Sequence, residues 1–178
     1  IKTIAVVGAG PAGLAAATTA ARRGHKVTLF DAADEIGGQF NIAKKIPGKE
    51  EFYETIRYFS KEISLSGVVL RLGARIKHKD LTSFDEVILA TGVKPRMPEI
   101  NGVQHPTVMG YLDVINGAQV GKSVAVIGAG GIGFDISEFL IHNGASTSLD
   151  IPEFMKEWGI DMTFKARGGV EGMVAKFN

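Results

Sequence analysis

The sequence predicts an α/β fold built on a parallel sheet, and three observations predict it. A short apolar run over residues 4–7, bounded by glycine, is typical of a strand buried on both faces of a sheet. An alanine-rich segment over residues 11–23 follows, and Gly24 after two arginines suits the end of a helix. A second apolar run over residues 27–30 ends at Asp31, so the first 31 residues predict a strand, a helix and a parallel strand.

The middle of the chain predicts a further helix and two further strands. Apolar residues at helical spacing over residues 52–63 predict an amphipathic helix that begins near Pro47 and ends before Gly67. Residues 68–72 and 87–89 are apolar and short enough for strands. Residues 92–106 contain three prolines and two glycines, a composition that resists regular structure and marks a hinge or boundary.

The opening pattern then recurs, because Gly128 begins a second glycine-rich motif 120 residues after Gly8. Residues 123–127 predict the preceding strand, and a helix follows whose apolar face is Ile132, Ile136, Phe139 and Leu140. Asp150 is expected to cap a short helix that ends at Gly159. The repeat fits two copies of one nucleotide-binding unit, with a first domain over residues 1–115 and an incomplete second domain over residues 116–178.

Composition excludes several classes of function. The 178 residues carry a net charge of +1, which gives no general attraction to nucleic acid or to an anionic membrane. No apolar stretch reaches the roughly 18 residues of a membrane span. The chain contains no cysteine, and its four histidines lack metal-ligand spacing, so we expect no metal site. No signal peptide is recognisable, and we expect a cytoplasmic protein.

The first glycine motif, residues 8–13, matches G-x-G-x-x-G between a strand and a helix. Gly8 permits a tight turn, Gly10 lets the backbone approach a pyrophosphate, and Gly13 allows close packing of helix on strand. The helix N-terminus attracts the phosphates. Asp31, at the end of the second strand, can accept hydrogen bonds from both ribose hydroxyls and repels a 2′-phosphate. The motif therefore favours FAD or NAD over NADP.

The second motif, residues 128–133, has the same context and should also hold a pyrophosphate. No residue that would select its nucleotide is identifiable. Two dinucleotide sites in one chain favour electron transfer between two cofactors.

Longer runs of the sequence resemble known families more specifically than the glycine motifs do. The first motif, Asp31, Ile88-Leu89-Ala90-Thr91-Gly92 and the second motif resemble two-dinucleotide-binding flavoproteins of the glutathione reductase type, a Rossmann-like fold that this chain would contain in truncated form. Residues 37–44, 46–52, 130–135 and 157–161 closely resemble the bacterial NADPH-dependent 2,4-dienoyl-CoA reductases.

That resemblance implies a modular oxidoreductase that acts in unsaturated fatty-acid β-oxidation. Electrons would pass from NADPH to FAD, then through a 4Fe-4S cluster to FMN in an N-terminal barrel, and finally to an enoyl-CoA substrate. By matching position, the residues that would contact FAD are Gly8, Gly10, Pro11, Ala12, Gly13, Asp31, Gly38, Gln39, Ile76, Ala90, Thr91 and Gly92. The residues that would face NADPH are Gly128, Gly130, Gly131 and Ile132.

Two alternatives to a dienoyl-CoA reductase stay open at this point. One is a related barrel flavoprotein that acts on another enone or on an amine. The other is a binding module whose first site holds only ADP and carries out no redox chemistry.

No catalytic residue is identified, because the resemblance places the proton donors and the substrate pocket outside these residues. We expect the chain to be a part of a longer protein and to be inactive alone. Lys49 either belongs to a solvated helix entry or reaches a phosphate.

Overall fold

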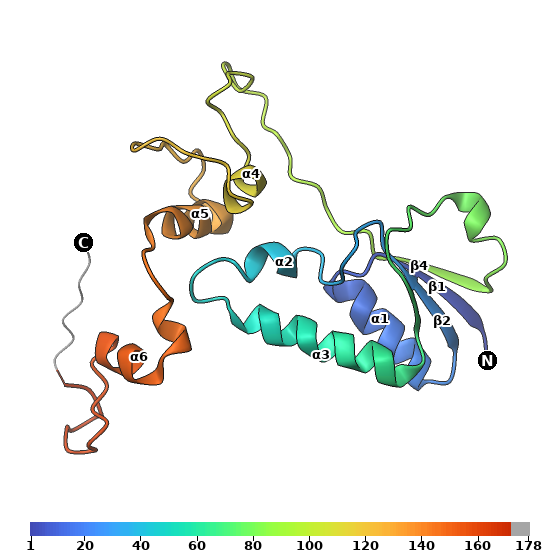
Figure 1. Cartoon of the computed structure of the whole chain (residues 1–178), viewed down its shortest axis with the longest axis horizontal. Helices are drawn as coiled ribbons and strands as arrows, with labels where there is room; N and C mark the ends of the chain where they lie inside the picture. The colour runs from blue at the N-terminus through green and yellow to red at the C-terminus, as the bar shows by residue number, and fades with distance from the viewer. Residues whose placement is uncertain (172–178) are drawn as a thin grey trace.

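A computed structural model describes residues 1–171 and contains one four-stranded parallel sheet. Its strands are β1 (Thr3–Val7), β2 (Lys26–Phe30), β3 (Val69–Arg71) and β4 (Glu86–Leu89), in the order β3-β2-β1-β4. The chain leaves β1 toward β2 on one side and later returns to place β4 on its other side (Figure 1). The carboxyl ends of β1 and β4 therefore border the switch point where ligands bind in open α/β sheets.

Two helices cover one face of this sheet (Figure 1). They are α1 (Pro11–Arg22) and α3 (Glu51–Ser66), and α3 ends at Gly67, which adopts a left-handed conformation with φ of +75°. The side chains buried between sheet and helices are those of Ile4, Val6, Leu14, Ala17, Val27, Leu29, Ile63 and Val68. The predicted strands at residues 4–7, 27–30, 68–72 and 87–89 and the helices at 11–23 and 52–63 are thus confirmed, with ends that shift by a few residues.

The remainder of the chain forms short elements joined by extended segments. These are α2 (Phe40–Ala43), a 3₁₀ turn at His78–Asp80, α4 (Tyr111–Ile115), α5 (Gly131–Ile141), a 3₁₀ turn at Thr147–Leu149 and α6 (Ile151–Glu157). Residues 92–106 contain neither helix nor strand, as their proline and glycine content predicts. Asp150 caps α6 by accepting a hydrogen bond from the Glu153 backbone N–H, and this predicted cap is confirmed.

A second, smaller apolar cluster joins three distant parts of the sequence. Ile46 precedes α3, Ile115 ends α4 and Ile136 lies within α5, and all three are buried. Ile42, Tyr111, Phe139 and Leu140 pack around them. This cluster fixes α5 against the connection that leads from α2 to α3.

Two expectations about the second unit are wrong. Residues 123–127 run extended but form no strand, because no other strand of residues 1–171 lies beside them to complete a ladder of hydrogen bonds. Ile132 is 54% exposed, so the apolar face of α5 consists of Ile136, Phe139 and Leu140 without it. Helices among residues 1–171 are all too short or too polar to cross a membrane.

Candidate functional site

The first glycine loop has no room for side chains at two of its glycines. Gly8 adopts a φ of +110°, and a Cβ there would lie 2.2 Å from the carbonyl oxygen of Ala90. A Cβ on Gly13 would lie 1.7 Å from the carbonyl oxygen of Gly8. Gly10 differs, because the nearest atom to its Cβ position is the Gly38 Cα at 4.0 Å. The loop is therefore crowded on the protein side at Gly8 and Gly13, and open at Gly10, where a phosphate is expected to approach.

Hydrogen bonds hold this loop between two strand ends. The Gly8 N–H donates to the carbonyl oxygen of Phe30 at 2.7 Å, and the Ala90 N–H donates to that of Val7 at 2.8 Å. Thr91 and Gly92 continue directly from Ala90, and Gly92 has a φ of +70°. The structure thus places the predicted Ala90-Thr91-Gly92 segment beside the first glycine motif at the carboxyl edge of the sheet.

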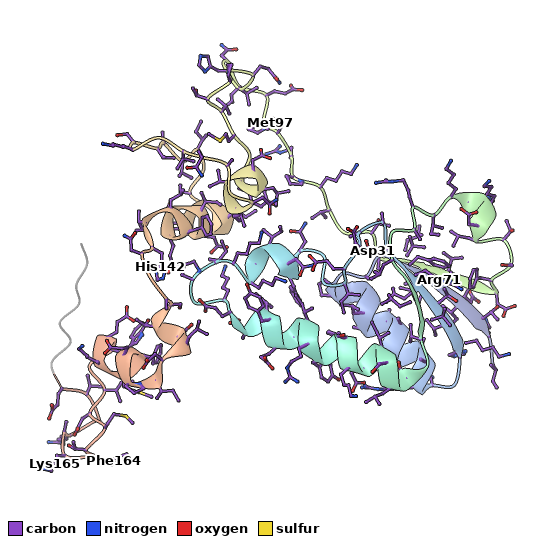
Figure 2. The ribbon with its side chains drawn as sticks, viewed as in Figure 1. Asp31, Arg71, Met97, His142, Phe164 and Lys165 are labelled. Atoms are coloured by element: carbon purple, nitrogen blue, oxygen red, sulfur yellow. The ribbon has the colours of Figure 1, made fainter. Side chains whose placement is uncertain are left out.

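Asp31 is aimed at the same loop (Figure 2). Its Oδ2 accepts a hydrogen bond from the Ala9 N–H at 2.5 Å, and its Oδ1 accepts one from the Ala33 N–H at 2.8 Å. An ionised carboxylate has about four lone-pair positions, so two acceptor positions remain for other donors. The side chain is therefore fixed in orientation and retains the capacity to accept from ribose hydroxyls.

A second pair of glycines packs on the first loop. Gly37 donates its N–H to the Ala9 carbonyl oxygen at 2.8 Å, and Gly38 lies so close to Gly10 that a Cβ there would approach the Gly10 Cα to 2.9 Å. Both have positive φ, +116° and +51°. Gln39 points its amide toward the Val93 carbonyl oxygen at 3.5 Å. Gly38 and Gln39 were predicted to contact FAD from the sequence and Gly37 was not, although the Gly-Gly pair was the available signal.

Ile76 lies in the loop that follows β3, which is also tied to Asp31. The Ala74 N–H donates to the Asp31 carbonyl oxygen at 2.7 Å, and Ile76, two residues later, is half-buried. Figure 2 shows Asp31 and Arg71, the last residue of β3, at this part of the molecule. The residues predicted to contact FAD therefore come from loops at one edge of the sheet.

The second glycine loop repeats the backbone of the first. Gly128 has a φ of +113°, close to that of Gly8, and a Cβ on Gly133 would lie 2.0 Å from the Gly128 carbonyl oxygen. Gly130 is extended before α5 as Gly10 is before α1. A Cβ on Gly128, Gly130 or Gly131 would meet no atom within 4 Å among the described residues. This loop therefore has the local geometry of a dinucleotide turn on a helix separate from the first site.

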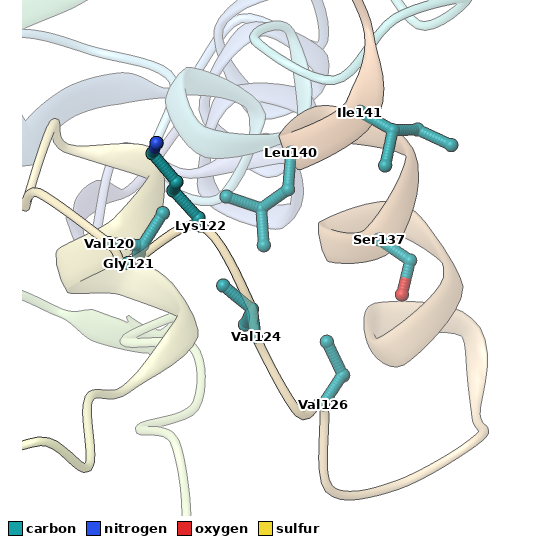
Figure 3. Close-up of a pocket in the computed structure, with 8 residues that line it drawn as sticks. All are labelled: Val120, Gly121, Lys122, Val124, Val126, Ser137, Leu140 and Ile141. Atoms are coloured by element: carbon teal, nitrogen blue, oxygen red, sulfur yellow. The ribbon is translucent and has the colours of Figure 1, made fainter.

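The segment before the second loop faces α5 across a pocket of about 310 Å³. Figure 3 shows Val124 and Val126 on this segment opposite Ser137 and Leu140 on α5. The strand prediction for residues 123–127 came from their likeness to the apolar run before the first glycine motif. The pocket lies behind the helix and not at its glycine loop, so we assign it no ligand.

Both loops fit the pyrophosphate of a dinucleotide. Neither α1 nor α5 has a side chain that caps its N-terminus, and the first N–H groups of a helix have no partner within the helix. Such N–H groups, with the helix dipole, favour an anion. No group of metal-ligating side chains occurs within residues 1–171. Lys49 is not directed to a phosphate, because its Nζ pairs with Asp135 of α5 at 2.6 Å.

Comparison with known families agrees with this geometry. Residues 2–159 match the model of the pyridine nucleotide-disulphide oxidoreductases. The chain therefore belongs to that family, a class of NAD(P)H-dependent flavoprotein oxidoreductases, and membership implies binding of FAD and NAD(P)(H).

Relatives of this chain include much longer proteins. It is 36% identical over 168 residues to an NADH oxidase of Thermoanaerobacter brockii, covering 90% of this chain and 26% of that protein. It is 33% identical to an N,N-dimethylglycine/sarcosine dehydrogenase of Chromohalobacter salexigens, covering 83% of this chain and 23% of that protein. The structure of a 2-naphthoyl-CoA reductase matches with a TM-score of 0.75 and 30% identity, over 87% of this chain and 26% of that one. The chain thus spans about a quarter of the length of these relatives.

Proposed function

We propose that this chain is the FAD-binding and NADPH-binding portion of a 2,4-dienoyl-CoA reductase of unsaturated fatty-acid β-oxidation. The observation that carries the proposal is the convergence of the first glycine loop, Asp31, Gly38 and the segment after Ala90 at one edge of the sheet. The choice of dienoyl-CoA rests on the resemblance of the longer sequence runs. A cytoplasmic location belongs to the same proposal.

The proposal assigns FAD to the domain formed by residues 1–115 and NADP(H) to the domain that begins at residue 116, whose residues 172–178 lie outside the described part. The first loop receives the FAD pyrophosphate at Gly10, Ala12 and Gly13, while Asp31 accepts from its ribose. Gly38, Gln39, Ile76 and the 90–92 segment line the cofactor. Gly128, Gly130, Gly131 and Ile132 face NADP(H), and the exposure of Ile132 leaves its side chain free to do so.

The second loop would hold NADPH as the hydride donor and the first loop would hold FAD as the acceptor, and the proposal places a 4Fe-4S cluster and FMN, as the onward acceptors, outside this chain. The residues described here bind and orient. Their backbone N–H groups would donate hydrogen bonds to the pyrophosphate. The absence of a side chain at Gly10 leaves room for the phosphates, and its absence at Gly38 lets that loop pack on Gly10. No residue of the chain is assigned a role in proton transfer to the substrate.

A match to a CoA-ester reductase structure supports the CoA substrate class. A specific observation favours a second candidate, because the dimethylglycine/sarcosine dehydrogenase shares 33% identity over 159 residues. An amine or a different enone as substrate is therefore the alternative to test, together with a non-redox module that holds only ADP.

The test is anaerobic reduction of the protein that carries this chain, followed by reoxidation with candidate substrates. We expect NADPH to bleach the flavin absorbance and a trans-2,trans-4-dienoyl-CoA to restore it faster than a saturated acyl-CoA or an aryl enone. A secondary or tertiary amine, which can only donate electrons, should not bleach the oxidised protein. Reoxidation by an amine-derived iminium or by the aryl enone alone would overturn the dienoyl-CoA assignment. A protein that neither NADPH nor NADH bleaches would overturn the reductase assignment itself.

A further inference from the structure

The connection between α2 and α3, residues 44–50, contacts the part of the chain that carries the second glycine loop. Lys49 Nζ lies 2.6 Å from Asp135 Oδ2 on α5. The Gly48 N–H donates to Ser146 Oγ at 3.3 Å, and the Ser148 hydroxyl donates to Glu50 Oε2 at 2.7 Å. These contacts join residues 86 to 98 positions apart in the sequence.

Apolar side chains pack around this polar contact and fix the place where it forms. Ile46, in the same connection, is 2% exposed and packs in one cluster with Ile136, the residue after Asp135. The Lys49 and Asp135 side chains are only 39% and 29% exposed, so the pair is partly withdrawn from water. A partly buried pair of this kind is less screened than a surface salt bridge.

The position of Asp135 on α5 gives the pair a consequence for ligand binding. Asp135 lies four residues after Gly131, about one helical turn or 6 Å along the axis from the loop that is expected to hold a pyrophosphate. An unpaired carboxylate there would repel the phosphates that the helix N-terminus attracts. Lys49 cancels that charge from the first domain and, through the same contact, holds α5 in place.

We propose that Lys49 is a positioning residue for the second dinucleotide site, which it orients and neutralises through Asp135. The inference rests on the proposed function, because it requires NADP(H) at the second loop. A residue of the first domain would thus contribute directly to the affinity of the second site for NADP(H). Lys49 itself touches neither cofactor nor substrate.

The experiment uses the intact flavoprotein and three variants, Lys49→Met, Asp135→Asn and the double variant, with NADP⁺ as the probe. Lys49→Met leaves the carboxylate without its partner, and we expect its NADP⁺ dissociation constant to rise about tenfold. Asp135→Asn removes the repulsive charge together with the pair and should weaken binding by less. The double variant should recover most of the loss of Lys49→Met. FAD content should be unchanged in all three.

Lys45→Met is the matched control, since Lys45 lies on the same connection but donates to the neutral side chain of Asn116 at 2.9 Å. It should change the NADP⁺ dissociation constant by less than about twofold. Backbone hydrogen exchange over residues 131–141 supplies a readout without turnover and should be faster in Lys49→Met than in Lys45→Met.

Three results would each overturn a different part of these proposals. Equal NADP⁺ affinity in Lys49→Met and Lys45→Met would overturn the positioning role while the proposed function stands. A double variant as weak as Lys49→Met would overturn the neutralising role. Wild-type protein that reduces its flavin with neither NADPH nor NADH and binds no NADP⁺ would overturn the proposed function, and this inference with it.

Discussion

At the scale of single residues, Gly13, the third residue of α1, is more tightly constrained by its surroundings than Gly131, the first residue of α5. A Cβ on Gly13 would overlap the Gly8 carbonyl oxygen, whereas a Cβ on Gly131 would meet no described atom within 4 Å. The obstacle at Gly13 is backbone, which cannot rotate away as a side chain can. The same contact recurs at Gly133, whose Cβ would lie 2.0 Å from the Gly128 carbonyl oxygen, so it comes from the close approach of each glycine loop to the helix that follows it.

Gly13→Ala is therefore expected to lower the free energy of unfolding by about 1–3 kcal/mol, as overpacking typically does. Gly131→Ala is the matched control and should leave stability unchanged or slightly raised, because alanine favours a helix over glycine. Thermal or urea unfolding followed by circular dichroism measures both. Equal stability of the two variants would contradict the packing described for Gly13.

Asp31 carries the second prediction at this scale. Its carboxylate is oriented by the Ala9 and Ala33 N–H groups, and hydrogen bonds to a charged group contribute about 1.5–3 kcal/mol. Asp31→Asn should thus weaken FAD binding by about tenfold or more. Asp34→Asn, a change of an exposed carboxylate in the same loop, should leave it unchanged. Titration of the apoprotein with FAD checks both. Equal FAD dissociation constants for the two variants would show that Asp31 does not contribute to FAD binding.

The sequence predicted the residues of local motifs but not the contacts between distant segments. The G-x-G-x-x-G spacing and a carboxylate at a strand end are local signals, so Gly8, Gly13 and Asp31 were accessible from the sequence. The contact of Gly37 with Ala9 and the pairing of Lys49 with Asp135 depend on segments 28 and 86 residues apart coming together. The Gly37-Gly38 pair indicates a turn that needs glycine, but no local pattern says which distant segment either contact joins.

At the scale of elements, the contrast between β1 and residues 123–127 shows what a strand needs beyond its sequence. Both are short apolar runs before a glycine turn. β1 lies between β2 and β4 and is hydrogen-bonded on both sides, whereas no described strand pairs with residues 123–127. The glycine turn and helix form in both units, because their hydrogen bonds are local. Helices and turns were therefore predicted more reliably than this strand.

The loop after α6 provides a prediction about pH. Asp161 is buried and accepts hydrogen bonds from the Thr163 hydroxyl at 2.6 Å, the Ala166 N–H at 2.5 Å, the Thr163 N–H at 2.7 Å and the Lys165 N–H at 2.6 Å. These bonds, led by that of the Thr163 hydroxyl, lower the pKa of Asp161 from 3.8 to about 2. The ionised form is thus favoured by the folded loop.

A depressed folded-state pKa means that the stabilisation is complete above the unfolded pKa near 4 and is lost as pH falls toward 2. We expect the amides of Thr163, Lys165 and Ala166 to lose hydrogen-exchange protection over that window. Asp161→Asn should lack protection at these amides even at neutral pH. An NMR titration of the Asp161 carboxyl that gave a midpoint near 3.8 would contradict the arrangement.

At the scale of the whole molecule, the structure links a sheet-based first unit to a second unit that is represented mainly by helices. The link runs through the Ile46, Ile115 and Ile136 cluster and the contact of residues 44–50 with α5. Several apolar side chains of the sheet also lie open, and Leu89 of β4 is 71% exposed. The relatives are about four times as long as this chain.

We propose that the first glycine loop and Asp31 together hold FAD. The most direct test is to denature the purified protein that carries this chain and identify the released nucleotides by chromatography and mass spectrometry. We predict one FAD per chain, identified by its mass, and its loss in Asp31→Ala but not in Asp34→Asn. Release of ADP alone, or of no dinucleotide, would contradict the account.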